Sequence, residues 1–444
     1  MSRRLRTEPV NLAGARWLRH PIWTQLRDGG WLDRRRVRAA ATILLALQFA
    51  GFVFIVAGTH GWFERWIGPL TKPTTTDFVS FYAAGALANA GTPALAYDHA
   101  AHLAAEERVT AAGIEYQYFN YPPVLILLCA ALATLPNLVA FILFEAATLG
   151  LYVVIATRIL ADRSGTAIVA LLAFPIVFWN FGLGQNGFLT AGLFGAATLL
   201  VDRRPIVAGL LFGALCYKPQ FGILVPLALA AAGQWRAFAA AAATVAVLVL
   251  ASLALFGAAT WQAFFAAAGA SPAMYESGRI LFAGMANPFG AARLLGAGPA
   301  LAYGLQAAAS LGAAAIVVVV WRRRLSLPTR AATLAAAAVV AAPLALLYDL
   351  MLASIAALWL IRDRDSPAAA AWEKVALAAL FLMVLDGRGL AERWHIPAFP
   401  LAVLALFAIA GARSWREMAQ RRVSLRAEQS NLGPREIAPL RSSQ

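Results

Sequence analysis

Asp77 is an acid in a polar and aromatic stretch that follows the first long apolar run of the chain. Phe78, Phe81 and Tyr82 follow it closely. Burial beside such rings raises the pKa of a carboxyl group toward the range in which it can take a proton from a hydroxyl group. This setting predicts a general base. The alternative is a structural helix cap, because Thr-Thr-Asp before an apolar run is typical of an N-cap.

Lys218 interrupts an apolar stretch that runs from Pro205 to Gly233. An ammonium group near the centre of a membrane helix costs about 2.5–3.5 kcal/mol, so it requires a compensating partner. A phosphate group would provide one, and the lysine would stabilise the charge that develops when the phosphate leaves. The alternative is that two short helices meet there and the lysine reaches water.

A short turn, Gly184-Gln185-Asn186-Gly187, separates two apolar runs. Its glycines permit a tight bend, and the amides of Gln185 and Asn186 offer donors and acceptors for sugar hydroxyls. A turn with a capping asparagine is the structural alternative.

Tyr121, Arg279 and Asp349 lie in other loops or at the ends of apolar runs. Tyr121 precedes a Pro-Pro pair that fixes a sharp helix start, so its ring either packs on a sugar or lipid or only shapes the turn. Arg279 is a candidate phosphate clamp, because a guanidinium group binds two oxygens at once; a solvated loop charge is the alternative. Asp349 is placed either to bind acceptor hydroxyls or to cap a helix at the interface.

Other reactive residues are expected to have structural roles. Glu145 lies inside an apolar run, where an interhelical hydrogen bond is expected. His99 and His102 are expected at the surface, because two histidines without further ligands make a poor metal site. The two cysteines do not suggest a disulfide framework. Since the outer segments hold no paired acids of the Asp-x-Asp type and the chain has no glycine-rich nucleotide loop, we expect no metal or other cofactor and no nucleotide-linked substrate.

The elements that must position these residues are membrane helices. The chain has 444 residues, of which 61% are hydrophobic and 13% charged, whereas soluble domains hold about 25% charged residues. Apolar runs of roughly 20 residues predict an all-α integral membrane protein with about twelve spans, within a range of roughly ten to thirteen. The predicted spans lie near 37–57, 138–159, 165–180, 185–201, 205–217, 219–233, 236–257, 299–320, 330–347, 350–361, 372–386 and 397–412.

The net charge of +15 does not indicate nucleic-acid binding, because arginines cluster at the ends of apolar runs. This is the pattern of cytoplasmic loops. Most Lys and Arg residues fall on one side if residues 121–136 lie along the membrane surface rather than across it. The resulting prediction is a multi-pass protein of the cell (inner) membrane, with both termini cytoplasmic and Asp77 facing the periplasm or cell exterior. The predicted regions are a basic segment at 1–36, a transmembrane domain at 37–412, outer loops at 58–136 and 258–298, and a polar, poorly ordered tail at 413–444.

Several short motifs follow one another in a fixed order. They are Asp77-Phe78 with Tyr82, Gly91-x-Pro93-x-x-x-Tyr97-Asp98, Tyr121-Pro122-Pro123, Gly184-Gln185-Asn186-Gly187, and Gly209 followed by Lys218-Pro219. Over roughly residues 40 to 350 this order resembles glycosyltransferase family 87, membrane enzymes of the GT-C class. The resemblance implies a GT-C-like helix bundle with interfacial helices in a long first outer loop. It also implies that the donor is a hexose, usually mannose, linked to polyprenyl phosphate, and that transfer to a lipid or glycan acceptor takes place at the outer face. In the same way it implies that Asp77 is the base of an inverting reaction and that Tyr82 is among the substrate-binding residues.

Two other functions fit a protein with many membrane helices. A secondary transporter usually has repeated halves and helices broken at mid-membrane. No internal repeat is evident here and the polar residues gather at the outer ends, although Lys218-Pro219 suits a broken helix. The other alternative is a non-enzymatic lipid-binding membrane protein. The ordered motifs favour the glycosyltransferase, whose expected partners are the donor, the acceptor and the bilayer.

Overall fold

The computed structural model describes residues 24, 27–59, 76–110, 112–277 and 280–431. Within these ranges every regular element is a helix, and a single isolated bridge pairs Met285 with Leu346. Alanine- and leucine-rich runs favour this outcome, because a helix satisfies the backbone hydrogen bonds of an apolar segment without help from water.

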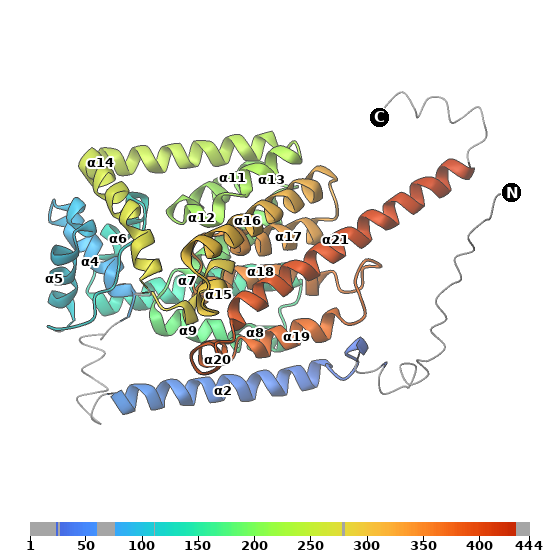
Figure 1. Ribbon diagram of the computed structural model, residues 1–444, viewed down its shortest axis with the longest axis horizontal. Coiled ribbons are helices and arrows are strands. Elements are labelled where there is room, and N and C mark those ends of the chain that lie inside the picture. The colour runs from blue at the N-terminus through green and yellow to red at the C-terminus, as the bar shows by residue number, and fades with distance from the viewer. Residues whose placement is uncertain (1–23, 25–26, 60–75, 111, 278–279, 432–444) are drawn as a thin grey trace.

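The first helices cover residues 34–160, and those between residues 78 and 132 lie together at the left of Figure 1. The elements of this region, with η marking 3₁₀ helices, are α2 (Arg34–Thr59), α4 (Phe78–Asn89), η2 (Pro93–Tyr97), α5 (His99–Val109), α6 (Pro123–Leu132) and α7 (Asn137–Leu160). The segment predicted to lie along the membrane surface, residues 121–136, thus contains the short helix α6. Gly85 allows α4 to touch this helix closely, because a Cβ atom there would lie 2.0 Å from the carbonyl oxygen of Cys129.

The rest of the described chain is a bundle of longer and shorter helices. Its elements are α8 (Gly165–Leu172), α9 (Pro175–Leu183), α10 (Gly187–Leu200), α11 (Pro205–Ala214), η3 (Leu215–Tyr217), α12 (Pro219–Gly222), α13 (Val225–Ala231), α14 (Trp235–Glu276), η4 (Phe282–Gly284), α15 (Pro288–Leu294), α16 (Pro299–Arg322), α17 (Leu327–Ala341), η5 (Leu347–Asp349), α18 (Leu350–Arg362), α19 (Glu373–Met383), α20 (Gly387–Trp394) and α21 (Ala398–Asn431).

Five of these helices are long and apolar enough to cross a membrane, namely α2, α7, α14, α16 and α21. The pair α8 and α9, bent by 58°, makes a sixth if it is counted as one span. Each predicted span coincides with helical structure, but the expected number of about twelve is not confirmed. Helices α10, α11, α17, α18 and α19 have only 14, 10, 15, 13 and 11 residues, and a helix that crosses alone needs about 20.

Helix α14 bends sharply at Gly257, whose φ of 78° lies in the left-handed region. Glycine permits this backbone conformation without a steric penalty. The helix then continues to Glu276 and packs against α6 and η2, as Figure 1 shows at the left of the molecule. The predicted second outer loop at 258–298 therefore begins as a helix.

Polar contacts join the loops at one end of the bundle, which we call the basic end. Asp202 accepts hydrogen bonds from Gln234 at 3.3 Å and from Arg330 at 2.5 Å. A further ion pair links Arg413 to Glu373. Helices α10, α11, α13, α17 and α18 each begin or end at these loops. Their opposite ends therefore carry the turn at 184–187, Lys218 and Asp349, and we call that end the site end.

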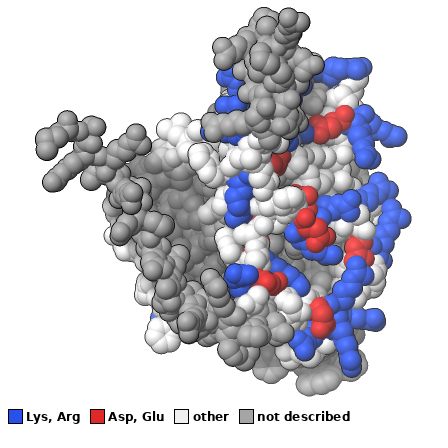
Figure 2. Space-filling model, turned by 90° about the vertical axis from the view of Figure 1, so that its right-hand side faces the viewer, with Lys and Arg blue, Asp and Glu red and all other residues white. Residues whose placement is uncertain are grey.

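Lys and Arg side chains gather over the basic end, which faces the viewer in Figure 2. Helix α21 extends from this end of the bundle in Figure 1. The tail from residue 413 was predicted to be poorly ordered, but α21 remains helical through Asn431. The reason is that Arg413 and Ser414 are buried against the bundle, which continues the helix beyond its apolar part. Residues 432–444 lie outside the described residues.

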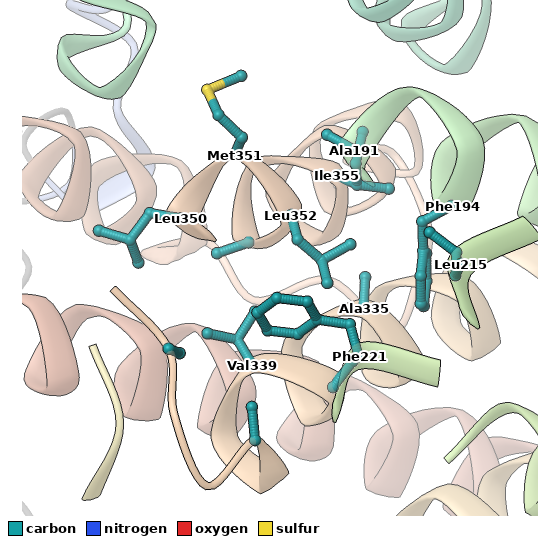
Figure 3. Close-up of a cluster of buried hydrophobic side chains, with 14 of the residues drawn as sticks. Ala191, Phe194, Leu215, Phe221, Ala335, Val339, Leu350, Met351, Leu352 and Ile355 are labelled. Carbon is teal, nitrogen blue, oxygen red and sulfur yellow. The ribbon is translucent and has the colours of Figure 1, made fainter. Parts of the chain in front are cut away.

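Small residues bring the helices of the core close together. A Cβ atom on Gly209 would lie 2.3 Å from the carbonyl oxygen of Ala237, so α11 and α14 are in backbone contact. Larger side chains fill the centre, where Phe221 lies among Val339, Leu352 and other residues of α10, α17 and α18 (Figure 3). This packing fixes α12, which follows Lys218 directly.

Candidate functional site

Asp77 lies at the N-cap position of α4, but its side chain makes no capping hydrogen bond to the residues that the structure describes. Its Oδ2 instead accepts a hydrogen bond from Gln185 Nε2 at 2.7 Å. The carboxylate therefore joins the start of α4 to the turn between α9 and α10, and the capping alternative does not account for it.

Two glycines allow the turn at 184–187 to approach its neighbours. Gly184 has a φ of +67°, and a Cβ atom there would lie 2.7 Å from Phe78 Cβ. On Gly187 a Cβ atom would lie 2.3 Å from Asn180 Oδ1 and 2.6 Å from the carbonyl oxygen of Tyr348. The turn is thus held against both α4 and η5, the elements that carry Asp77 and Asp349.

Hydrogen bonds fix the orientation of the Gln185 amide. Its Oε1 accepts from the Tyr121 hydroxyl and from the Asn186 backbone amide, both at 3.3 Å, which directs Nε2 toward Asp77. Asn180, which the sequence did not single out, stabilises the turn, because its Nδ2 donates to the Gln185 carbonyl at 2.8 Å.

Lys218 and Asp349 form a buried ion pair, with Nζ donating to Oδ1 at 2.6 Å and side-chain exposures of 3% and 4%. The second carboxylate oxygen, Oδ2, accepts from the Leu346 backbone amide at 2.9 Å. The ammonium group lies 5.0 Å from the centre of the Tyr348 ring and 5.8 Å from that of Tyr121, distances at which a cation is attracted to an aromatic face. The partner that Lys218 requires is therefore Asp349, a pairing that the sequence did not reveal.

Burial is the main electrostatic influence on this cluster. It raises the pKa of Asp77, while the hydrogen bond from Gln185 and the charge of Lys218 act in the opposite direction. Burial also raises the pKa of Tyr121 well above its usual value, so its hydroxyl keeps its proton. Asp77 is half-buried as a residue, whereas Gln185 and Lys218 are buried, so the cluster comes closest to the surface at Asp77.

Asn186 is fully buried, yet neither atom of its side-chain amide has a protein hydrogen-bond partner within the described residues. A buried polar group without a partner costs about 1–3 kcal/mol. This amide is therefore the group in the turn with unused capacity for hydrogen bonds.

Comparison with protein families now adds to this geometry. The model of glycosyltransferase family 87 matches residues 119–347, more than half of the chain. The chain belongs to glycosyltransferase family 87. Comparison with curated proteins and with solved structures gave no match.

The matched region of this family 87 protein contains Tyr121, Gln185, Asn186 and Lys218. Asp77 precedes it, and Asp349 follows its last residue closely. The structure thus joins residues inside the family match to two acids outside it.

Two of the predicted site residues are not part of this cluster. The Tyr82 hydroxyl donates to the Leu135 carbonyl at 2.8 Å, which fastens α4 to the end of α6. Arg279 lies outside the described residues. The interhelical hydrogen bond expected for Glu145 is also not seen, since both of its buried carboxyl oxygens have no hydrogen-bond partner in the described part of the chain.

A second buried group lies beside the Asp77 helix, and the surface location expected for His102 is wrong. His102 and Glu106 are both fully buried, and Nδ1 lies 3.4 Å from Oε1. Burial lowers the pKa of His102 to about 4 and raises that of Glu106 to about 8, so both are neutral near pH 7. His102 Nε2 lies 3.1 Å from the Ser80 carbonyl oxygen in the first turn of α4. The spacing of four residues was the signal for this pair, while His99 is exposed as expected.

No group of three or more His, Cys, Asp or Glu side chains that could hold a metal ion occurs within the described ranges. Both cysteines are free thiols. The side chains of the cluster supply two carboxylates, an ammonium group, two amides and tyrosine hydroxyls.

Proposed function

We propose that this family 87 protein transfers a hexose from polyprenyl phosphate to a hydroxyl group of a lipid or glycan acceptor, and that the hexose is mannose. The observation that carries the proposal is the position of Asp77. Its carboxylate bonds to Gln185 rather than to its own helix, in a cluster that contains Lys218. Membership of the family supports glycosyl transfer, and the residues supply the roles.

In the proposed reaction Asp77 accepts the proton of the acceptor hydroxyl. Gln185 occupies Oδ2, which leaves Oδ1 to face the acceptor. The acceptor oxygen bonds to the anomeric carbon on the side opposite the phosphate, and the bond between this carbon and the phosphate oxygen breaks. The bonding electrons leave with the phosphate, and the configuration at the anomeric carbon inverts.

Lys218 has the charge and the donors to stabilise the departing phosphate. An ammonium group has three N–H donors, and Asp349 takes one of them. The remaining donors can meet phosphate oxygens as negative charge develops. Asn186 and Gln185 orient the sugar through their amides, Tyr121 contributes to the substrate wall, and Asp349 holds Lys218. Tyr82 positions α4 through its bond to the Leu135 carbonyl, and Arg279 provides a second phosphate contact.

We further propose a GT-C-like arrangement of about twelve helical segments, with both termini cytoplasmic and the site end at the outer face of the cell membrane. The gathering of Lys and Arg at the basic end in Figure 2 supports this orientation, because cytoplasmic loops carry an excess of these residues. The site end lies at the other ends of the same helices.

The decisive experiment compares Asp77→Asn with Asp98→Asn, a substitution in the same segment at a true helix cap. Purified protein is incubated with labelled polyprenyl-phosphate mannose, with and without candidate acceptors. We expect acceptor-dependent release of polyprenyl phosphate, reduced by roughly 10²–10⁴-fold in Asp77→Asn because the base is lost. Asp98→Asn should retain most activity and only weaken α5.

Unchanged turnover in Asp77→Asn would remove Asp77 from the mechanism. Acceptor-independent transport of an intact lipid-linked sugar, without release of polyprenyl phosphate, would favour the transporter alternative. Binding without release or transport would favour the non-enzymatic alternative.

A further inference from the structure

A groove of about 610 Å³ lies at the basic end, far along the chain from the cluster around Asp77. It is formed by the first turns of α2 and the start of α8. Its lining residues are Arg34, Arg35, Arg38, Ala39, Thr42, Ile43 and Thr166. The groove exists because α2 lies along one edge of the bundle and packs chiefly against α8 (Figure 1).

Two contacts hold α2 in this position. Arg34 lies 3.2 Å from Asp162, and Gln48 Nε2 donates to the Ala173 carbonyl at 3.1 Å. The groove opens between these points. Arg35 and Arg38 are exposed and have no acidic partner in an ion pair within the described part of the chain. Their guanidinium groups are therefore free to bind an anion.

An apolar stripe continues from the charged end of the groove. Residues four apart lie on one face of a helix, so Arg35, Ala39, Ile43 and Leu47 follow one another along α2. The side chains of Ile43 and Leu47 are 62% and 64% exposed. The face thus changes along its length from cationic to apolar, in the direction that leads away from the basic end.

We propose that this groove binds an anionic phospholipid, with the headgroup phosphate against Arg35 and Arg38 and an acyl chain along Ile43 and Leu47. Guanidinium groups bind phosphate oxygens in pairs, and basic pockets between membrane helices are typical sites for anionic headgroups. Thr42 and the nearby α8 offer hydroxyl groups beside the headgroup. A free phosphate would match the arginines but would leave the apolar stripe uncovered, which is why the lipid is favoured.

The test uses native mass spectrometry of the full-length protein, released from detergent after incubation with phosphatidylglycerol or with phosphatidylcholine of the same chain length. We expect the wild type to retain phosphatidylglycerol several-fold more than phosphatidylcholine. Arg35→Gln combined with Arg38→Gln should abolish most of this preference. The matched control is Arg322→Gln combined with Arg323→Gln, which removes two exposed charges from the same end outside the groove and should leave the preference intact.

A further variant, Ala39→Trp, fills the groove but keeps every arginine. It should lose the bound lipid as the double arginine variant does, whereas millimolar inorganic phosphate should not displace lipid from the wild type. Equal losses in the two arginine pairs, retention of lipid by Ala39→Trp, or displacement by phosphate would each overturn the proposal. Thermal unfolding of each purified variant identifies any that fail to fold. If Ala39→Trp does not fold, the smaller substitution Ala39→Leu takes its place.

Discussion

The two ends of the bundle each bury an ion pair, and the pairs differ in how completely the protein satisfies them. At the basic end Arg413 donates to Glu373 through Nε at 3.0 Å and to the Leu360 carbonyl at 2.9 Å. Glu373 also accepts from Arg416 and from the Ala370 backbone amide. This network joins α19 and α21 and leaves little capacity for an additional ligand.

At the site end the ammonium group of Lys218 donates a hydrogen bond only to Asp349 among the described residues, and aromatic rings lie around it. The other two N–H donors of the ammonium group have no acceptor in the part of the chain that the structure describes. The two ion pairs are thus similarly buried, but the protein provides partners for more of the hydrogen-bonding groups at the basic end than at the site end. We infer that the basic end uses its charges to hold loops together, while the site end holds a charge ready for a ligand.

The largest expected effect comes from replacing each pair by apolar residues. Lys218→Met alone leaves Asp349 buried and unpaired, which should cost about 3–5 kcal/mol of stability. Adding Asp349→Leu should restore much of the stability, because well-packed apolar replacements of buried pairs are often neutral. Transfer activity should remain about 10²–10³-fold below wild type, since the phosphate charge is no longer stabilised.

The matched variant is Arg413→Met with Glu373→Leu at the basic end. It should change the thermal unfolding temperature but keep activity per folded molecule. Unfolding in detergent and turnover of the lipid-linked donor are measured for both pairs. The comparison fails if the basic-end variant loses activity as strongly as the site-end variant, or if Lys218→Met with Asp349→Leu remains active.

The features that the sequence could predict are those with local signals. Apolar runs located the helices, arginine clusters located the loops of the basic end, and the glycine-flanked amides predicted the turn at 184–187. The number of complete spans was not predictable in the same way. Helices of 10 to 15 residues such as α11 and α17 have a composition similar to that of parts of the longer helices, and neither length nor composition shows which of them cross the membrane.

The pairings within the site depend on contacts between distant segments. Lys218 and Asp349 are 131 positions apart, and Gln185 and Asp77 are 108 positions apart. Each residue was singled out because an ionisable or amide group beside an apolar run needs a partner, but composition cannot say which group provides it. His102 was missed because its burial depends on how α4, α5 and the segment before α6 pack together.

A second prediction tests whether close backbone packing holds the site end in place. In Gly187→Ala the added Cβ would lie within 2.6 Å of the Tyr348 carbonyl and closer still to Asn180. Such overpacking should cost about 1–3 kcal/mol and should lower activity, because the turn that carries Asn186 must move. The control is Gly182→Ala, where a Cβ meets nothing within 4 Å. It should stabilise α9 by about 0.5–1 kcal/mol. Equal unfolding temperatures for the two variants would contradict this account.

A third prediction extends the comparison to His102 and Glu106, a buried pair that is neutral. Folded Glu106 keeps its proton up to about pH 8, whereas the unfolded chain loses it near 4.5, so Glu106 makes stability fall as pH rises between these values. His102 acts oppositely between about pH 4 and 6.5, because only the unfolded chain binds its proton there. The two effects offset each other up to pH 6.5, above which stability should fall by about 2 kcal/mol by pH 8.

Glu106→Gln should remove that fall. The measurement is the unfolding temperature at several pH values, with Glu107→Gln, the same substitution at the next position, as the control. A decline between pH 6.5 and 8 that persists in Glu106→Gln would show that another group causes it.

The smallest expected effect concerns the side-chain amide of Gln185, which connects Asp77 to Tyr121. Gln185 lowers the pKa of Asp77 through its hydrogen bond, so Gln185→Leu should raise that pKa further. A base works only when deprotonated, and the acidic limb of the pH profile of kcat/KM should therefore move to higher pH. Gln117→Leu, between α5 and α6, is the control, because the Gln117 side chain is bonded to the Glu115 carbonyl; it should leave the limb in place. If the acidic limb stays at the same pH in Gln185→Leu, Asp77 is not the titrating base. A loss of activity in both variants would not change this conclusion. A structural defect lowers the rate at every pH and does not move the limb.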